Sequence, residues 1–92
     1  MSEHPCHKSE ISKLNRIGGQ VEGIKRMIDG GRYCPDILTQ LRAVRAALKT
    51  VELNVLEHHM QSCVADAMKS GSKAESDEKI AELKDIMKRF QS

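Results

Sequence analysis

The sequence predicts an all-α protein built from three helices, of which the central helix is much the longest. The chain has no Trp, one Phe and one Tyr, so an apolar interior must come from aliphatic side chains and methionine, which suits packed helices better than sheets. Apolar residues recur every three or four positions, which is the period of a helix. Only two prolines occur in 92 residues, so long stretches contain no helix breaker.

The first expected helix spans about residues 9–29. Its apolar residues are three or four positions apart and form one stripe: Leu14, Ile17, Val21, Ile24 and Ile28. Ser9 is the expected N-cap, and the Gly30-Gly31 pair is the expected stop. Interior glycine costs a helix about 1 kcal/mol relative to alanine. Gly19 and Gly23, which share a face, therefore either admit a neighbouring backbone or are a tolerated weak point.

The central helix is expected over about residues 35–68. Pro35 suits its first turn, and neither glycine nor proline occurs from Asp36 to Ser70. A heptad-like apolar seam runs along it: Ile37, Leu41, Val44, Leu48, Val51 and Val55. A helix of this length would reach about 50 Å, well beyond the radius of roughly 13 Å expected for a compact domain of this size. It therefore needs a partner, most economically a second copy of the chain.

The third helix is expected over about residues 73–90, after the short turn SGSK. Ser72 and Glu75 have the spacing of a capping box. Acidic residues gather at the start of this segment and basic residues at its end, which complements the helix dipole. Its apolar residues form a stripe along one face of the helix: Ile80, Leu83, Met87 and Phe90.

A histidine and a cysteine in the stretch LEHHMQSC are candidate metal ligands. His59 and Cys63 are four residues apart, so their side chains leave one face of a helix. Cys34 precedes Cys63 by twenty-nine residues, roughly 43 Å of helix, so a single straight helix cannot bring them together. If two copies pair antiparallel about an axis near Leu48, Cys34 of one copy meets His59 and Cys63 of the other. An antiparallel dimer would thus hold two identical intersubunit sites.

The donor set of this predicted site indicates the metal. Two thiolates and one imidazole favour Cu(I), while zinc is possible with a fourth ligand. A His-x3-Cys pair on a helix is more often incidental, so the prediction depends on the matching positions of all three residues. The N-terminal HPCH stretch adds His4, Cys6 and His7, which are extra ligands, a reactive thiol or a tail without a role.

Charge and hydropathy limit the classes of function. A net charge of +2 is weak evidence for nucleic-acid binding, but basic residues share helix faces that could contact phosphates. The first face holds Lys13, Arg16 and Gln20, and the second holds Arg42, Arg45 and Lys49. No membrane span or signal peptide is evident, and three cysteines fit a reducing cytoplasm. No nucleophile–base arrangement or cofactor motif indicates an enzyme.

The sequence resembles the copper-sensing transcriptional repressor family (CsoR, RcnR and FrmR type) over nearly its whole length. The features that carry the resemblance are the R-I-x-G-Q run at 16–20, the cysteine at the start of the central helix, and the His-x3-Cys near its end. The resemblance implies an all-helical dimer of dimers, a homotetramer, that binds operator DNA without a helix-turn-helix. It also implies that Cu(I) binding releases the DNA.

The resemblance assigns roles to individual residues. It implies that Cys34, His59 and Cys63 are the metal ligands. Tyr33 and a glutamate of the third helix, Glu78 or Glu82, would support those ligands. The DNA-binding or coupling residues would be Arg16, Gln20 and Lys49. Arg45 is a further candidate for DNA binding because it lies on the basic face of the central helix.

Two other interpretations remain open from the sequence. Relatives in the same family sense persulfide or formaldehyde, here through Cys34 with or without Cys63. The other alternative is a copper-binding carrier that does not bind DNA. The sequence alone leaves open the true inducer, the operator, and the choice between dimer and tetramer.

Overall fold

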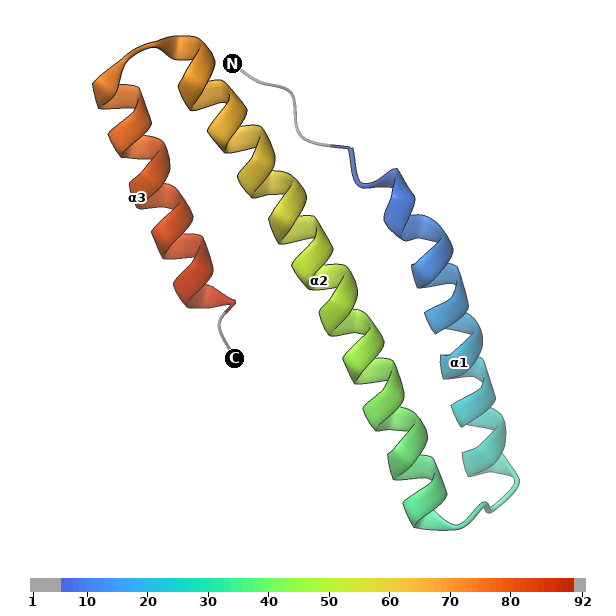
Figure 1. Cartoon of the computed structure of the whole chain (residues 1–92). Coiled ribbons are helices and arrows are strands. Elements are labelled where there is room, and N and C mark those ends of the chain that lie inside the picture. Colours follow the sequence, from blue (N-terminus) through green and yellow to red (C-terminus); the bar gives the residue numbers. More distant parts are fainter. Residues whose placement is uncertain (1–5, 91–92) are drawn as a thin grey trace. The chain divides into compact units, whose positions relative to one another are not determined.

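The computed structural model describes residues 6–90, except the side chains of residues 67 and 70, and these residues form three α-helices. A short 3-10 turn, η1 (Lys8–Glu10), leads into α1 (Ile11–Asp29), which is followed by α2 (Cys34–Ser70) and α3 (Lys73–Arg89) (Figure 1). No strand occurs in this part of the chain. The predicted all-α class with a long central helix is confirmed, and each helix end lies within two residues of the predicted position.

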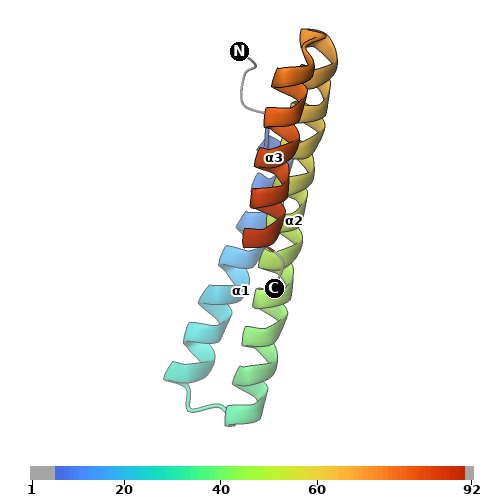
Figure 2. The same ribbon diagram turned by 90° about the vertical axis from the view of Figure 1, so that its left-hand side faces the viewer.

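The chain divides into two compact units at residue 55. The first unit, Cys6–Val55, contains η1, α1 and the first part of α2, and the second, from Leu56 onward, contains the rest of α2 and α3. Within the first unit, α1 lies beside α2 and runs in the opposite direction (Figure 1 and Figure 2). The expectation of a single domain over residues 1–92 stays a prediction, and residues 1–5 of the expected flexible leader lie outside the described residues.

Helix α1 ends in a glycine-dependent motif. Gly31 adopts a left-handed conformation with φ 69°, which favours glycine because that residue has no Cβ. The Arg32 N–H donates to the Met27 carbonyl at 2.9 Å, and the Gly31 N–H donates to the Ile28 carbonyl at 3.1 Å. These two bonds define a Schellman motif. The stop that the sequence predicted at Gly30-Gly31 is confirmed.

The start of α1 differs from the prediction. Ser9 was expected as the N-cap, but that position belongs to Glu10, because η1 precedes the α-helix and shifts its start. The Ser9 hydroxyl donates instead to Glu10 Oε2 at 3.2 Å. Helix α3 begins as predicted, since the Ser72 hydroxyl accepts the Glu75 N–H at 3.3 Å.

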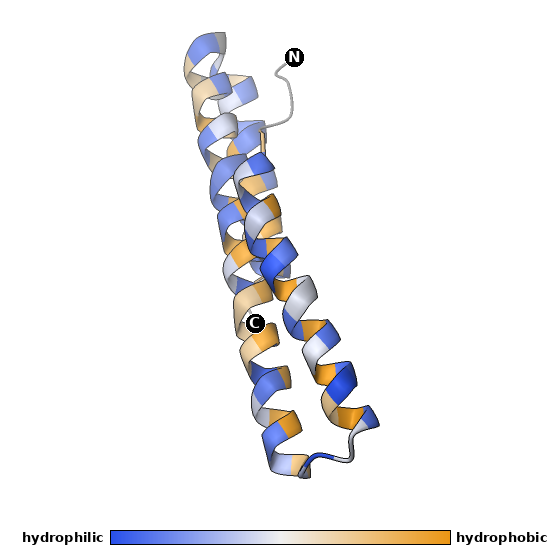
Figure 3. Ribbon diagram, turned by 90° about the vertical axis from the view of Figure 1, so that its right-hand side faces the viewer, coloured by the Kyte–Doolittle hydropathy of each residue, from blue (hydrophilic) through white to orange (hydrophobic). Residues whose placement is uncertain are grey.

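The core of the first unit uses only part of each apolar seam. Ile17 and Ile24 of α1 pack with Val44 and Val51 of α2, and all four are buried. Other residues of the same seams remain exposed: Leu14, Val21 and Ile28 on α1, and Leu41 and Leu48 on α2. Figure 3 shows apolar positions recurring along α1 between polar ones. The first unit therefore presents a second apolar surface that its own residues do not cover.

The interior glycines of α1 face open space within the chain. A Cβ added at Gly19 would meet nothing within 4 Å, and one at Gly23 would meet only Arg26 Nη2, at 3.7 Å. Within residues 6–90, no other backbone segment therefore approaches this face closely. The described part of the chain does not make the close approach that the sequence allowed for.

Candidate metal centre

His59 and Cys63 lie together on α2, as their spacing predicts. The Cys63 Sγ is 3.4 Å from the His59 Nε2. Cys63 is 5% exposed and His59 is half-buried. A thiol and an imidazole so placed offer two donors to one metal ion without rearrangement of the helix.

An acidic side chain of α3 approaches this pair. Glu82 Oε1 lies 3.9 Å from His59 Nε2, and both Glu82 and Glu78 are exposed. The carboxylate thus faces the same ring nitrogen as the Cys63 thiol, at a distance that suits an ion pair only when the imidazole is protonated. Of the two glutamates that the sequence left as alternatives, Glu82 is the one placed beside the histidine.

The surroundings of the Cys63 thiol raise its pKa. Burial raises the pKa of Cys63 above its ordinary value, and the negative charges of Glu82 and Asp66 raise it further, against the opposing effect of Lys79. Because thiolate is the form that binds metals, metal binding here would release a proton.

Cys34 is the first residue of α2 and belongs to the first unit. Its thiol is free and exposed, and Tyr33 beside it is 71% exposed. The Tyr33 carbonyl accepts the Asp36 N–H at 3.0 Å, which begins the helix. Among residues 6–90 of one chain, no three His, Cys, Asp or Glu side chains converge to hold a metal ion. The site shared between two copies stays a prediction.

The N-terminal HPCH stretch is only partly described. His4 lies outside the described residues, Cys6 is an exposed free thiol, and His7 is half-buried with its carbonyl accepting the Glu10 N–H at 2.9 Å. Whether this stretch contributes a ligand stays a prediction. No helix among the described residues is long and apolar enough to cross a membrane.

The predicted DNA-contacting side chains all belong to the first unit and are exposed. Arg16 and Gln20 come from α1, and Arg45 and Lys49 come from α2. Arg45 also borders a groove lined by apolar residues such as Leu38 and Leu41. Exposed cations of this kind are available to phosphate groups.

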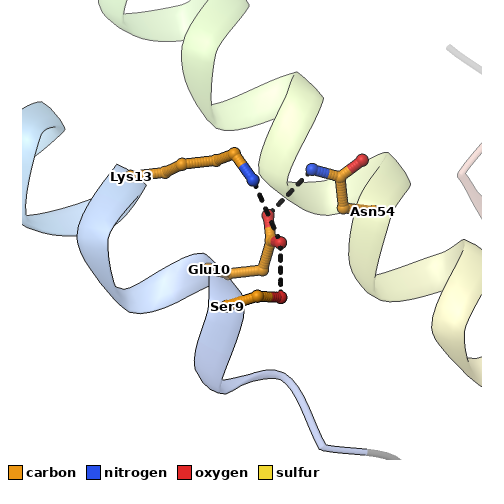
Figure 4. Close-up of polar contacts among 4 residues, drawn as sticks. All are labelled: Ser9, Glu10, Lys13 and Asn54. Atoms are coloured by element: carbon orange, nitrogen blue, oxygen red, sulfur yellow. Dashed lines mark hydrogen bonds and ion pairs between the residues drawn. The ribbon is translucent and has the colours of Figure 1, made fainter.

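Glu10 is a buried charged residue that sequence analysis missed. It is 3% exposed, and its Oε1 accepts from Asn54 Nδ2 at 2.9 Å (Figure 4). Its Oε2 accepts from Ser9 Oγ at 3.2 Å and from Lys13 Nζ at 3.3 Å. The hydrogen bond from Asn54, followed by those from Lys13 and Ser9, lowers the pKa of Glu10 against the opposing effect of burial. An acid at a helix start ordinarily indicates an exposed residue that complements the dipole, so no local signal marked its burial.

Comparison with known proteins defines the family of the chain. A family model described as metal-sensitive transcriptional repressor matches residues 7–89. The chain belongs to the metal-sensitive transcriptional repressor family.

Two relatives are named as copper sensors. The chain is 51% identical over 90 residues to the copper-sensing transcriptional repressor CsoR of Bacillus subtilis (strain 168), covering 91% of this chain and 86% of that protein. It is 47% identical over 70 residues to the copper-sensing transcriptional repressor RicR of Mycobacterium tuberculosis (strain ATCC 25618 / H37Rv), covering 76% of this chain and 72% of that protein.

Two solved structures share the fold over most of their length. The nickel-responsive transcriptional regulator InrS matches with a TM-score of 0.79 and 32% identity, covering 98% of each chain. The copper-sensing repressor CsoR with Cu(I) from Geobacillus thermodenitrificans NG80-2 matches with a TM-score of 0.76 and 39% identity, covering 92% of this chain and 85% of that one.

Proposed function

We propose that this chain is a cytoplasmic DNA-binding repressor that releases its operator when Cu(I) binds Cys34, His59 and Cys63 at a site shared by two copies. The observation that carries the proposal is the 3.4 Å pairing of Cys63 Sγ with His59 Nε2. Sulfur and imidazole donors without a carboxylate suit Cu(I), whereas structural zinc takes four ligands. Relatives named as copper-sensing repressors, at 51% and 47% identity, support the same assignment.

The exposed half of the apolar seam supports the shared site. Leu14, Val21 and Ile28 on α1 and Leu41 and Leu48 on α2 are each at least 40% exposed. Two helical hairpins that bury such residues against each other would form a four-helix arrangement. An antiparallel pairing of this kind delivers Cys34 of the partner subunit to the His59–Cys63 pair. Assembly of two dimers into a homotetramer follows the family resemblance.

The residues around the ligands have defined roles in this proposal. In the metal-bound state, Glu82 would support His59 by accepting a hydrogen bond from the ring nitrogen that does not bind the metal. Tyr33 directly precedes Cys34 and would support that ligand. Cys63 gives up its proton as the thiolate forms. For metal binding to release the operator, the metal must bind the free repressor more tightly than the DNA-bound repressor. Such coupling is typically ~1–3 kcal/mol.

The operator would be held through the exposed side chains of the first unit. Arg16 and Lys49 offer cations to phosphates, and Gln20 and Arg45 add hydrogen-bond donors. The proposed role is one of binding alone and needs no catalytic group.

The direct test titrates operator-bound protein with Cu(I), Ni(II) or Zn(II) and follows DNA release by fluorescence anisotropy. Cu(I) is expected to release the DNA, and His59→Ala is expected to abolish that release. His58→Ala is the matched control, because His58 is adjacent but points about 100° away around the helix. Operator affinity that Cu(I) leaves unchanged would refute the copper assignment.

The same assay separates the alternatives. Cys34 is exposed and free, so persulfide or formaldehyde can be added without metal and its product at Cys34 read by mass spectrometry. Release under those conditions would indicate covalent sensing. A copper carrier would bind Cu(I) but would not bind operator DNA, so the anisotropy of the DNA would not change when the protein is added.

A further inference from the structure

Glu10 ties the start of α1 to a distant point on α2. Its carboxylate is almost fully buried, yet it receives the Asn54 amide from 44 residues away. Burying a carboxylate is unfavourable unless hydrogen bonds compensate it. Glu10 also pairs with Lys13 at i, i+3 spacing and 3.3 Å. The Glu22–Lys25 pair on α1 has the same spacing and a similar distance, 3.2 Å, but both its side chains are at least 60% exposed. Unlike that exposed pair, the buried Glu10 arrangement contributes to fixing where α1 begins relative to α2.

The two ends of this contact lie close in sequence to the two predicted functional surfaces. Asn54 precedes His59 by five residues on α2, about one and a half helical turns. Glu10 directly precedes the α1 segment that carries Lys13, Arg16 and Gln20, and Lys13 is itself ion-paired with Glu10 at 3.3 Å. The contact thus joins the part of α2 that leads to the metal ligands with the part of α1 that carries predicted DNA contacts.

We propose that Glu10 and Asn54 form a latch, closed in the metal-free protein and opened by metal binding, that positions the start of α1 for operator binding. This inference rests on the proposed function. In the closed latch, the Asn54 amide donates to Glu10, and the start of α1 is held in one register along α2 with its basic face exposed. Glu10 and Asn54 are positioning residues, because they act through the side chains of α1 and need not touch DNA.

The physical reason for two states is the short range of the hydrogen bond. The Glu10–Asn54 bond is 2.9 Å long, and a shift of α2 by about 1 Å would break it. An open latch leaves Glu10 Oε1 without the Asn54 donor, while Ser9 and Lys13 still donate to Oε2, and a buried oxygen without a donor is unfavourable. The start of α1 must then move to let water reach Glu10, and the move displaces Lys13 and Arg16. A small change near His59 thereby becomes a change in the DNA-binding surface.

The test measures operator affinity and Cu(I) affinity in full-length variants. Glu10→Ala and Asn54→Leu are each expected to weaken operator binding of the metal-free protein by about three- to tenfold, the order expected for the loss of one hydrogen bond. With Cu(I) bound, both should match the Cu(I)-loaded wild type, because the latch is then already open. By reciprocity, DNA-free variants should bind Cu(I) more tightly than wild type. The double variant should be no weaker than either single one.

Two matched variants isolate the latch from charge and stability. Glu10→Gln keeps an acceptor for Asn54 and should stay near wild type, while Glu22→Gln breaks the exposed pair on the same helix and should have no effect. Asn54→Leu keeps the test decisive if Glu10→Ala does not fold. Variants that only lower the melting temperature, with unchanged operator and Cu(I) affinities, would overturn the latch. If wild type itself keeps its DNA in Cu(I), the proposed function fails, which is a separate outcome.

Discussion

The two units of the chain differ in what they bury. The first, Cys6–Val55, encloses four aliphatic side chains and a carboxylate, and it carries the predicted DNA contacts. In the second, among the described side chains, Cys63 is buried and α3 has no buried residue. The half with the His59–Cys63 pair thus has little apolar core of its own. Elements that respond to ligands are commonly drawn from such weakly packed regions, and a second copy would supply the missing contacts.

The largest expected effect tests the difference in packing directly. Ile24→Ala removes a side chain that is 5% exposed and should lower the free energy of unfolding by about 2–5 kcal/mol. Ile80→Ala on α3, where the side chain is 51% exposed, should cost less than about 1 kcal/mol. Urea unfolding at one protein concentration measures both. Equal losses of unfolding free energy in the two variants would mean that another copy of the chain buries Ile80 in solution. The two units would then differ in packing only in the isolated chain.

The next effect sharpens the role of α3. Glu82→Gln should weaken Cu(I) binding by about 10- to 100-fold, the range typical for a partner of a metal-binding histidine. Glu78→Gln is the matched control and should leave the affinity unchanged, since only Glu82 lies 3.9 Å from His59. Competition with a chromophoric Cu(I) chelator gives both affinities. A stronger effect of the Glu78 change would assign the supporting role to the other glutamate.

The pH dependence of stability should report on the first unit. The pKa of Glu10 is held below its ordinary value of 4.5, so its contribution to stability is present above the unfolded-state pKa and is lost as pH falls through the folded-state pKa. Glu10→Gln should therefore flatten the acid limb of the stability curve, measured by unfolding at pH 7 and at successively lower pH. An unaltered acid limb would mean that Glu10 is not the group responsible.

The smallest effect concerns the glycines of α1. Gly19→Ala and Gly18→Ala should each stabilise the helix by about 0.5–1 kcal/mol, because alanine loses less backbone freedom than glycine on folding. A Cβ added at either position would meet no other atom within 4 Å. Unfolding and sedimentation measure stability and assembly together. If Gly19→Ala alone disrupted assembly, a second copy would approach the backbone at that face.

The elements that the sequence predicted correctly depend on local interactions. Helix ends follow from Gly31 and Ser72, whose conformations and caps involve residues only a few positions away. The His59–Cys63 pair follows from a four-residue spacing that any α-helix turns into proximity. The helical period likewise predicted which apolar residues share one face of each helix. None of these features requires a contact between residues far apart in the chain.

Tertiary structure alone decided which half of each seam is buried. Ile17 and Ile24 pack against α2 while Leu14 and Val21 remain exposed, although all four share one stripe. Periodicity identifies an apolar face but not which edge of it meets the neighbouring helix. The same limit applies to Glu10, whose partner Asn54 is 44 residues distant.

Sequence by itself therefore determined the helices, their ends and the pair of soft donors, because each is set within about one helical turn. Folding decided the choice of Glu82 over Glu78 beside His59, the displacement of the α1 cap from Ser9 to Glu10, and the burial of that acid. Each of these depends on how one helix lies against another. That arrangement comes from the packing of side chains far apart in the chain, which local spacing does not specify.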